Sequence, residues 1–395
     1  MKKSVYFKTF LTLISAVTLC GCGTAADTSP TDTEEAVSPA DAVEATPPEL
    51  SEDDYKAKIE QLLETRAVVP DNAGALKDMV RCVTVSRILE EHGSIFSKMD
   101  NNVRARLRSQ IIDEVMRSES ALYSAIPIEQ SEGRYDADLL ISVEDAEALF
   151  GDVYGEESFT PAEYEQVKDG YILISYGDGE PWHLVEHNQY FEDEDYYLFT
   201  GPAFYEDNGG YTSFVGYADI LFAKKPESRF GATLLYGRYR NERIGVASVE
   251  TSSELSPSSK KTYSGMNLVD GDPSTVWVEG VPGTGGGETI TLHLEKEQPV
   301  YGIAICNGYT ADYDLYNNNG TLTRVAVSFG DLASIESSVG GYAFEGCSGD
   351  DLAGLNLNRL ELHEPVMTDT ITITIKEAKK GARYDDTCIS EIQVY

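Results

Sequence analysis

The sequence predicts a multidomain protein with a helical subdomain, an α+β middle domain built on an antiparallel meander, and a C-terminal all-β sandwich. Three observations predict this. Apolar residues recur at helical spacing over residues 52–125, change to alternation over 126–242, and alternate again in short glycine-punctuated runs over 243–395. A chain of 395 residues is long enough to bury two or three separate cores.

The first 21 residues have the pattern of a bacterial lipoprotein signal. Lys2, Lys3 and Lys8 give a basic start, an apolar run covers residues 10–19, and a small-residue segment ends at Cys22. The apolar run is about half of the roughly 20 residues that a membrane-spanning helix needs. We therefore expect Cys22 to carry a lipid that holds the protein on the extracytoplasmic face of the cell membrane.

Residues 22–51 are expected to form a disordered acidic tether. Between residues 23 and 50 there is no Lys, Arg or aromatic residue. Such a segment cannot bury enough apolar surface to offset the entropy lost on ordering.

The charge and the cysteines exclude some classes of function. A net charge of −36 argues against a nucleic-acid partner, whose phosphates would be repelled. The six cysteines form no pair of CxxC dyads that would hold zinc. Cys306 and Cys388 fall in predicted strands, where they either form a disulfide or simply pack, and packing is favoured because nothing fixes their separation.

Three helices are predicted in the helical subdomain, 52–125. The first starts at Ser51, an N-cap residue with Asp54 at position N3, and the next two carry apolar residues at helical spacing over 76–88 and 103–115. His92 and Cys82 lie in this part, where a lone His or Cys is more often a packing or surface residue than a catalytic one.

In the middle domain, 126–242, two short helices precede a meander of strands. One helix is capped by Ser142 and ends at Gly151, and the other has Thr160 at the N-cap and Pro161 at N1. The predicted strands cover residues 171–176, 182–187, 196–200, 214–223 and 233–239.

No catalytic constellation is evident in the middle domain. His183 and His187 superficially resemble a metal-binding pair, but in a strand they lie about 13 Å apart, too far to share an ion. Neither HExxH nor a nucleophile elbow is present. Because carboxylates are abundant, an enzyme with an unrecognised pair of them stays an open alternative.

The C-terminal domain, 243–395, has seven or eight predicted strands. Alternating apolar residues mark runs such as 290–294, 303–305, 325–329 and 371–375. Short strands with glycine-rich connections over about 150 residues are typical of a β-sandwich. Trp277, flanked by Val276 and Val278, is more often a core residue than a sugar-stacking one.

The stretch NLVDGDPSTVWVEGVPG, residues 267–283, contains the clearest candidate for a metal site. The carbonyl of Asn267, the carboxylates of Asp270 and Asp272, and the hydroxyl and carbonyl of Thr275 can converge if the loop curls. Hard oxygen ligands of this kind suit Ca²⁺, which takes six to eight of them.

This stretch resembles the DGDPxTxW signature of discoidin-like (coagulation-factor type C) domains. With VEGVPGTGGGE and ICNGYTADYDLYNNNG, it is more narrowly similar to the NADase-type glycan-binding domain, a galactose-binding-like branch of that fold. The resemblance covers residues 244–395 and implies a jelly-roll sandwich, carbohydrate binding and a structural Ca²⁺. It places Glu391 of the last strand, with Ser390 beside it, in the ligand set. One departure is that a single Arg324 stands where the family has a basic run.

Six residues are candidate glycan ligands: Glu279, Tyr309, Tyr313, Tyr316, Asn317 and Arg324. The three tyrosines follow Asn307-Gly308 in a polar stretch with little apolar company, where exposed aromatic rings usually bind something. The alternative is that these rings brace the loop against the sandwich.

The sequence thus predicts a lipid-anchored bacterial surface protein that binds a surface or cell-wall glycan through its C-terminal domain. Two alternatives remain open. One is a hydrolase that this module targets to polysaccharide, and the other is a non-catalytic structural or adhesion protein of the envelope.

Overall fold

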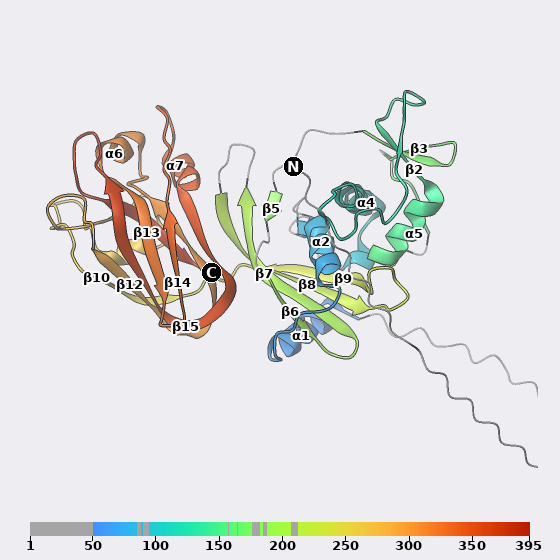
Figure 1. Cartoon of the computed structure of the whole chain (residues 1–395), viewed down its shortest axis with the longest axis horizontal. Helices are drawn as coiled ribbons and strands as arrows, with labels where there is room; N and C mark the ends of the chain where they lie inside the picture. Colours follow the sequence, from blue (N-terminus) through green and yellow to red (C-terminus); the bar gives the residue numbers. More distant parts are fainter. Residues whose placement is uncertain are drawn as a thin grey trace, which may run out of the picture. The chain divides into compact units, whose positions relative to one another are not determined.

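The computed structural model describes residues 50–84, 88–89, 95–156, 158–163, 165–175, 182–184, 188–206 and 212–395 (Figure 1). The predicted signal, Cys22 and nearly all of the tether lie outside these residues, as do His92 and His187. Within the described ranges, no helix combines the length and the apolar character needed to cross a membrane.

The N-terminal helices form where the periodicity predicts them: α1 (Glu52–Leu63), α2 (Ala73–Thr84), the 3₁₀ turn η1 (Phe96–Lys98) and α4 (Asn101–Val115). The predicted cap of α1 is confirmed. The Ser51 hydroxyl accepts from the Asp54 amide, and the Asp54 carboxylate accepts from the Ser51 amide, so two unpaired donors of the first turn are satisfied.

A small four-stranded sheet follows, in the order β1-β2-β4-β3. Its strands are β1 (Glu129–Gln130), β2 (Leu139–Ser142), β3 (Gln166–Lys168) and β4 (Tyr171–Ile174), and α5 (Val143–Tyr154) is inserted after β2. Ser142 caps α5 as predicted, but the helix continues past Gly151 to Tyr154, and Gly155, with a φ of 67°, provides the left-handed C-cap.

The helix predicted to start at Thr160 is wrong. The Glu165 carboxylate accepts from the Ala162 amide at 2.8 Å and pairs with buried Arg108, and the chain then enters β3. A tertiary ion pair therefore overrides the local capping signal, because it satisfies a guanidinium that would otherwise be buried without a partner.

The larger meander also forms, with the order β5-β7-β8-β9 and with β6 pairing to β7. Its strands are β5 (Trp182–Leu184), β6 (Gln189–Glu192), β7 (Tyr196–Glu206), β8 (Thr212–Lys224) and β9 (Ala232–Arg240). Three of them extend further than predicted, since cross-strand hydrogen bonds continue beyond the apolar alternation.

Three of the helices share one hydrophobic core with this sheet. Residues of α2, α4 and α5 pack in the same cluster as Phe199, Ile220, Phe222 and Leu234 of the meander. The opposite face of the sheet packs with α1, in a separate cluster that includes Leu198, Leu221 and Tyr236. The sheet therefore buries apolar side chains on both faces, each against helices.

The C-terminal domain is an antiparallel seven-stranded sheet in the order β11-β16-β12-β15-β13-β14, with β10 pairing to β12. The strands are β10 (Val246–Thr251), β11 (Trp277–Val278), β12 (Thr289–Asn307), β13 (Thr321–Phe329), β14 (Ala333–Ser338), β15 (Leu357–Lys379) and β16 (Cys388–Val394). The turn η2 (Gly265–Leu268) and the short helices α6 (Tyr313–Asn318) and α7 (Gly349–Leu355) lie in its connections.

The predicted inward faces form its core, including Ile290, Leu292, Ile303, Val325, Val327, Ile371 and Ile373. Trp277 is fully buried, as expected, and its indole N–H donates to the Ser253 carbonyl. Cys306 and Cys388 are buried free thiols, so packing and not a disulfide accounts for them.

Candidate functional site

The loop between η2 and β11 brings several oxygen atoms together around one hydroxyl. Thr275 Oγ1 lies 2.9 Å from Asp270 Oδ2, 3.1 Å from the Asp272 carbonyl and 3.3 Å from the Asn267 carbonyl. A hydroxyl donates only one hydrogen, so these three acceptors compete for it. An excess of converging acceptors is an environment that suits a cation.

Glu391 lies beside this loop with a carboxylate oxygen that has no partner. Its side chain is 5 % exposed, and within the described residues Oε2 accepts no hydrogen bond. Burial, followed by the charge of Asp270, raises the pKa of Glu391 to about 8. A buried carboxylate without a partner is costly unless a proton or a cation neutralises it.

The Asn267 carbonyl, the Asp270 carboxylate and the Thr275 hydroxyl therefore lie together, and Glu391 lies next to them. Asp272 contributes its carbonyl, whereas its predicted carboxylate accepts from the amide and the hydroxyl of Ser274. The Ser390 hydroxyl does not, because it donates to the Gly308 carbonyl at 2.9 Å and accepts from the Thr310 amide at 3.0 Å. No group of three His, Cys, Asp or Glu side chains in the described part of the chain is arranged to hold a metal. A cation here would thus depend on carbonyl and hydroxyl oxygens as well as on carboxylates.

Two of the three predicted glycan-binding tyrosines are buried, which contradicts the expectation of exposed rings. Tyr309 is 4 % exposed and Tyr316 is 7 % exposed. The Tyr316 hydroxyl donates to Asn356 Oδ1 at 2.7 Å, and burial raises the pKa of Tyr316 to about 12. The Tyr309 hydroxyl contacts the Lys261 ammonium, which also lies 4.7 Å from the ring centre. Both rings brace the polar stretch against the sandwich, which was the alternative reading.

The polar stretch is not an open loop, since residues 313–318 form α6 with Asp312 as its N-cap. Gly308, with φ 98°, allows the chain to turn toward it, and a Cβ there would lie 2.5 Å from the Tyr316 ring. Tyr313 is half-buried and Asn317 is exposed. Of the predicted residues, these two are the ones that α6 leaves at the surface.

The remaining two predicted residues are engaged elsewhere. Arg324, on β13, pairs with Glu336 at 2.6 Å and with Glu377 at 3.5 Å. Glu279 is fully buried and accepts from the Val281 amide through Oε2, while Oε1 has no partner among the described residues. Burial raises the pKa of Glu279.

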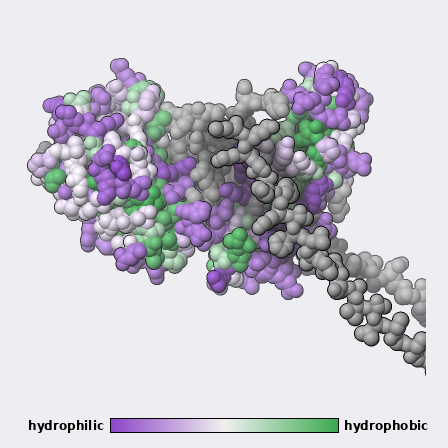
Figure 2. Space-filling model, viewed as in Figure 1, coloured by the Kyte–Doolittle hydropathy of each residue, from purple (hydrophilic) through white to green (hydrophobic). Residues whose placement is uncertain are grey.

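Exposed aromatic rings do occur near α6, at positions that the sequence reasoning missed. Tyr342 is 60 % exposed and Phe344 is 42 % exposed, and their ring centres lie 6.1 Å apart. The signal was present in GGYAFEGCSGD, an aromatic pair in a glycine-rich segment without strand alternation. The face drawn in Figure 2 is mostly hydrophilic over the sandwich, with small separate hydrophobic areas.

The segment that carries this pair is fixed to α6 and α7, which Figure 1 shows at the same end of the sandwich. Asn356, the residue after α7, accepts from the Tyr342 amide at 2.8 Å and donates to the Tyr342 carbonyl at 2.9 Å. The same amide oxygen accepts from Tyr316. Asn356 thus links the buried ring of α6 to the exposed aromatic pair.

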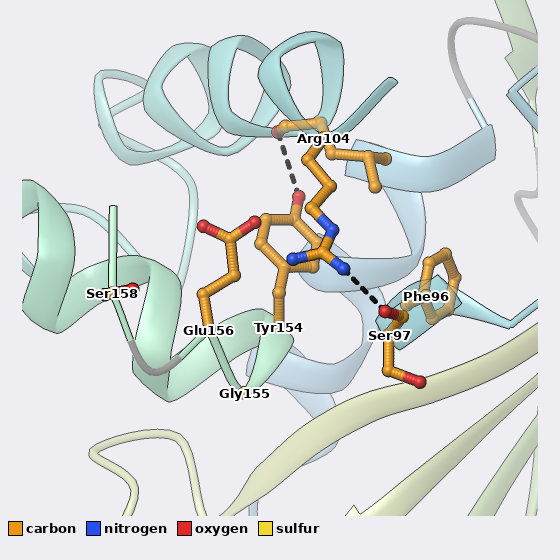
Figure 3. A pocket seen from close by; sticks show the side chains of 8 residues that line it. Phe96, Ser97, Arg104, Tyr154, Gly155, Glu156 and Ser158 are labelled. Carbon is orange, nitrogen blue, oxygen red and sulfur yellow. Dashed lines mark hydrogen bonds between the residues drawn. The ribbon is translucent and has the colours of Figure 1, made fainter. Parts of the chain in front are cut away.

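In the helical part, a cavity of about 310 Å³ is lined by α4, α5 and η1 (Figure 3). Its main polar groups are already bonded within the protein. Arg104 donates to the Ser97 and Met99 carbonyls, Tyr154 donates to the Leu107 carbonyl, and Glu156 pairs with Arg108. These contacts give Arg104, Tyr154 and Glu156 a structural role.

The C-terminal domain is a discoidin-like module. Residues 238–395 match the family model of the NAD glycohydrolase translocation F5/8 type C domain. This confirms the resemblance expected from the sequence, over the part of the chain where it was expected. Among the curated proteins, none matches the chain.

Solved carbohydrate-binding modules resemble the same domain. A family 32 module of C. perfringens NanJ, in complex with galactose, is 20% identical, with 37% of this chain and 91% of that chain covered and a TM-score of 0.25. The family 32 module of AlyQ, in complex with 4,5-unsaturated mannuronic acid, is 18% identical, with 39% and 98% covered and a TM-score of 0.26.

A third similar structure is chitosan-binding module 1 from a chitosanase/glucanase of Paenibacillus sp. IK-5. It is 11% identical, with 39% of this chain and 98% of that chain covered and a TM-score of 0.25.

Proposed function

We propose that this chain is a lipid-anchored surface protein that binds carbohydrate through the end of its C-terminal domain that carries α6 and α7. The observation that carries the proposal is the match of residues 238–395 to an F5/8 type C domain. The cavity of the helical part does not by itself favour a catalytic site, because its Arg104, Tyr154 and Glu156 side chains are bonded within the protein.

Tyr342 and Phe344 are the proposed contacts for the sugar rings. An aromatic face covers the C–H surface of a sugar, and two rings 6.1 Å apart form a short platform. Exposed aromatic pairs cost solvation energy in a free protein, so they usually mark a binding surface. Tyr313 and Asn317 of α6 remain proposed as neighbouring polar contacts.

The proposed ligands of a structural Ca²⁺ are the Asn267 carbonyl, Asp270, Asp272, Thr275 and Glu391. Their fit rests on the three acceptors around the Thr275 hydroxyl and on the unpartnered Oε2 of Glu391. The ion would supply positive charge that neutralises these oxygens and joins the loop to β16. Thr310, which donates to the Pro273 carbonyl at 2.9 Å, connects this loop to the chain that leads into α6.

The proposal is tested by replacing the aromatic pair. In the soluble chain from residue 23, Tyr342→Ala with Phe344→Ala is expected to lower binding on a glycan array about tenfold or more and to leave the melting temperature nearly unchanged. Tyr316→Ala is expected to show the opposite pattern, because its ring is buried and bonded to Asn356.

Tyr123→Ala is the matched control, since that ring is 55% exposed but belongs to the helical part. If the wild-type chain binds no glycan, or if the double variant binds as well as wild type, the proposed site is wrong.

A further inference from the structure

Residues 376–384 (KEAKKGARY), here called the basic segment, have a charge opposite to that of the rest of the chain. They carry four basic side chains, Lys376, Lys379, Lys380 and Arg383, and the acidic Glu377, in a protein of net charge −36. All four basic residues are exposed. The segment covers the end of β15 and the turn that follows it.

The four cations have no carboxylate partners among the described residues. Glu377 is the nearest acid in sequence, but it is engaged by Arg324 from β13 at 3.5 Å. Asp385 and Asp386 follow the segment and form no ion pair with it. In contrast, the exposed Arg117, Arg134 and Arg324 are all paired. Among the described residues, Lys260 and Lys296 also have no carboxylate partner, but in the basic segment four such cations lie within residues 376–383.

The backbone holds this segment rigidly against α6. The Ala382 amide donates to the Asn317 carbonyl at 2.9 Å, and the Tyr384 amide donates to the Asn318 carbonyl at 2.9 Å. Gly381 lies so close to this helix that a Cβ on it would come within 2.4 Å of the Asn318 backbone. The cations are thus displayed on an ordered turn, which lowers the entropy cost of binding.

An aromatic ring completes the surface. Tyr384 is 41% exposed, and the Arg383 guanidinium lies 5.1 Å from its ring centre. The basic segment and the Tyr342–Phe344 segment both contact α6, through Asn317 and Asn318 on one side and Tyr316 on the other. The two surfaces therefore flank the same short helix.

The neighbourhood favours a thin polyanion over a charged membrane. A flat anionic bilayer would also face the surrounding acidic residues, and these repel it within a Debye length of about 8–10 Å. A single extended polysaccharide chain can contact the cations and Tyr384 without approaching those acids.

We propose that the basic segment, with Tyr384, makes this domain selective for anionic glycans that carry carboxylates at regular spacing. This inference rests on the proposed carbohydrate-binding function and names the class of glycan. Uronate carboxylates would pair with the lysines and Arg383, while a sugar ring lies on Tyr384.

The test compares polygalacturonate with its fully methyl-esterified form, which has the same backbone without the charge. At about 0.1 M salt, where a Debye length of about 10 Å screens the more distant acidic residues, the chain from residue 23 is expected to bind the acid form at least tenfold more tightly, and most of this difference should be lost at about 1 M salt. The triple variant Lys379→Gln/Lys380→Gln/Arg383→Gln is expected to bind the acid form about tenfold more weakly, with an unchanged melting temperature.

Lys260→Gln/Lys296→Gln is the control, because both lysines are exposed in the same domain but away from the basic segment in the sequence. Equal binding of the acid and the ester, or an unaffected triple variant, overturns the inference while the proposed function stands. If the triple variant loses binding to vesicles that contain phosphatidylglycerol but still binds polygalacturonate, the inference is also overturned. That result would assign the segment to a membrane. Failure to bind any glycan on the array overturns both proposals.

Discussion

At the scale of single residues, burial separates the bracing side chains from the binding ones. Tyr309 and Tyr316 look like binding residues in the sequence, yet each is buried and bonded, to Lys261 and to Asn356. Tyr342 and Phe344 have less conspicuous neighbours and remain exposed. The identity of a residue gives its chemistry, and only its surroundings determine whether a ligand can reach it.

Glu279 provides a residue-scale prediction about pH. Burial raises the pKa of its carboxyl above the usual 4.5, so the folded state holds the proton more tightly than the unfolded state. The contribution of this bound proton to the free energy of unfolding is therefore fully present below about pH 4.5, and it is lost as the pH rises through the folded-state pKa of Glu279. Glu279→Gln, which is neutral at every pH, is expected to melt higher than wild type at pH 7.5.

The measurement is the difference in melting temperature between variant and wild type at pH 4 and at pH 7.5. The variant's melting temperature should exceed that of wild type by more at pH 7.5 than at pH 4. The exposed Glu345→Gln serves as the control and is expected to show no such difference. A Glu279→Gln protein that melts lower than wild type at pH 7.5 would show that the charged carboxylate is stabilising.

At the scale of elements, the loop that contains Asp270 and Asp272 connects distant strands. It is joined to β16 through Glu391 and to the approach to α6 through Thr310. Such a loop has few apolar contacts of its own, so its order depends on how its oxygens are satisfied.

Calcium is therefore expected to stabilise the protein. A ligand that binds only the folded state adds about 2.7 kcal/mol at a hundred times its dissociation constant. The melting temperature should rise by several degrees on adding Ca²⁺, and both Asp272→Ala and Glu391→Gln should abolish the rise. Above about pH 8, where the Glu391 carboxyl is ionised, Glu391→Gln should also melt higher than wild type in chelator, since it removes a buried charge whose Oε2 accepts no hydrogen bond among the described residues.

Asp331→Ala, at an exposed position in the same domain, should keep the calcium response. The calcium proposal fails if the wild-type protein melts at the same temperature in Ca²⁺ and in chelator.

At the scale of the whole molecule, the proposed arrangement places a glycan-binding domain beyond a long acidic segment and a lipid anchor. The anchor prediction rests on the basic start, the short apolar run and Cys22. Cys22→Ser is expected to leave the precursor unprocessed or to release the protein from membranes, as followed by fractionation and by mass. Processing and membrane fractionation identical to wild type would contradict the anchor.

Local patterns were enough to predict much of the fold. The Ser51 cap, the Ser142 cap, the strand alternation and the burial of Trp277 were all predictable, because capping depends on a few neighbouring atoms and alternation on the period of a strand. The sequence also indicated the discoidin-like class, since the signature DGDPxTxW lies within one loop.

Tertiary contacts decided the rest. Glu165 was drawn to Arg108 and prevented the helix at Thr160, and Tyr316 was buried by contact with Asn356, 40 residues further along the chain. The basic segment reached Asn317 and Asn318 through backbone hydrogen bonds between distant parts of the sequence. These outcomes depend on which side chains meet across the fold, and no local pattern contains that information because the same residues satisfy the same local rules when exposed.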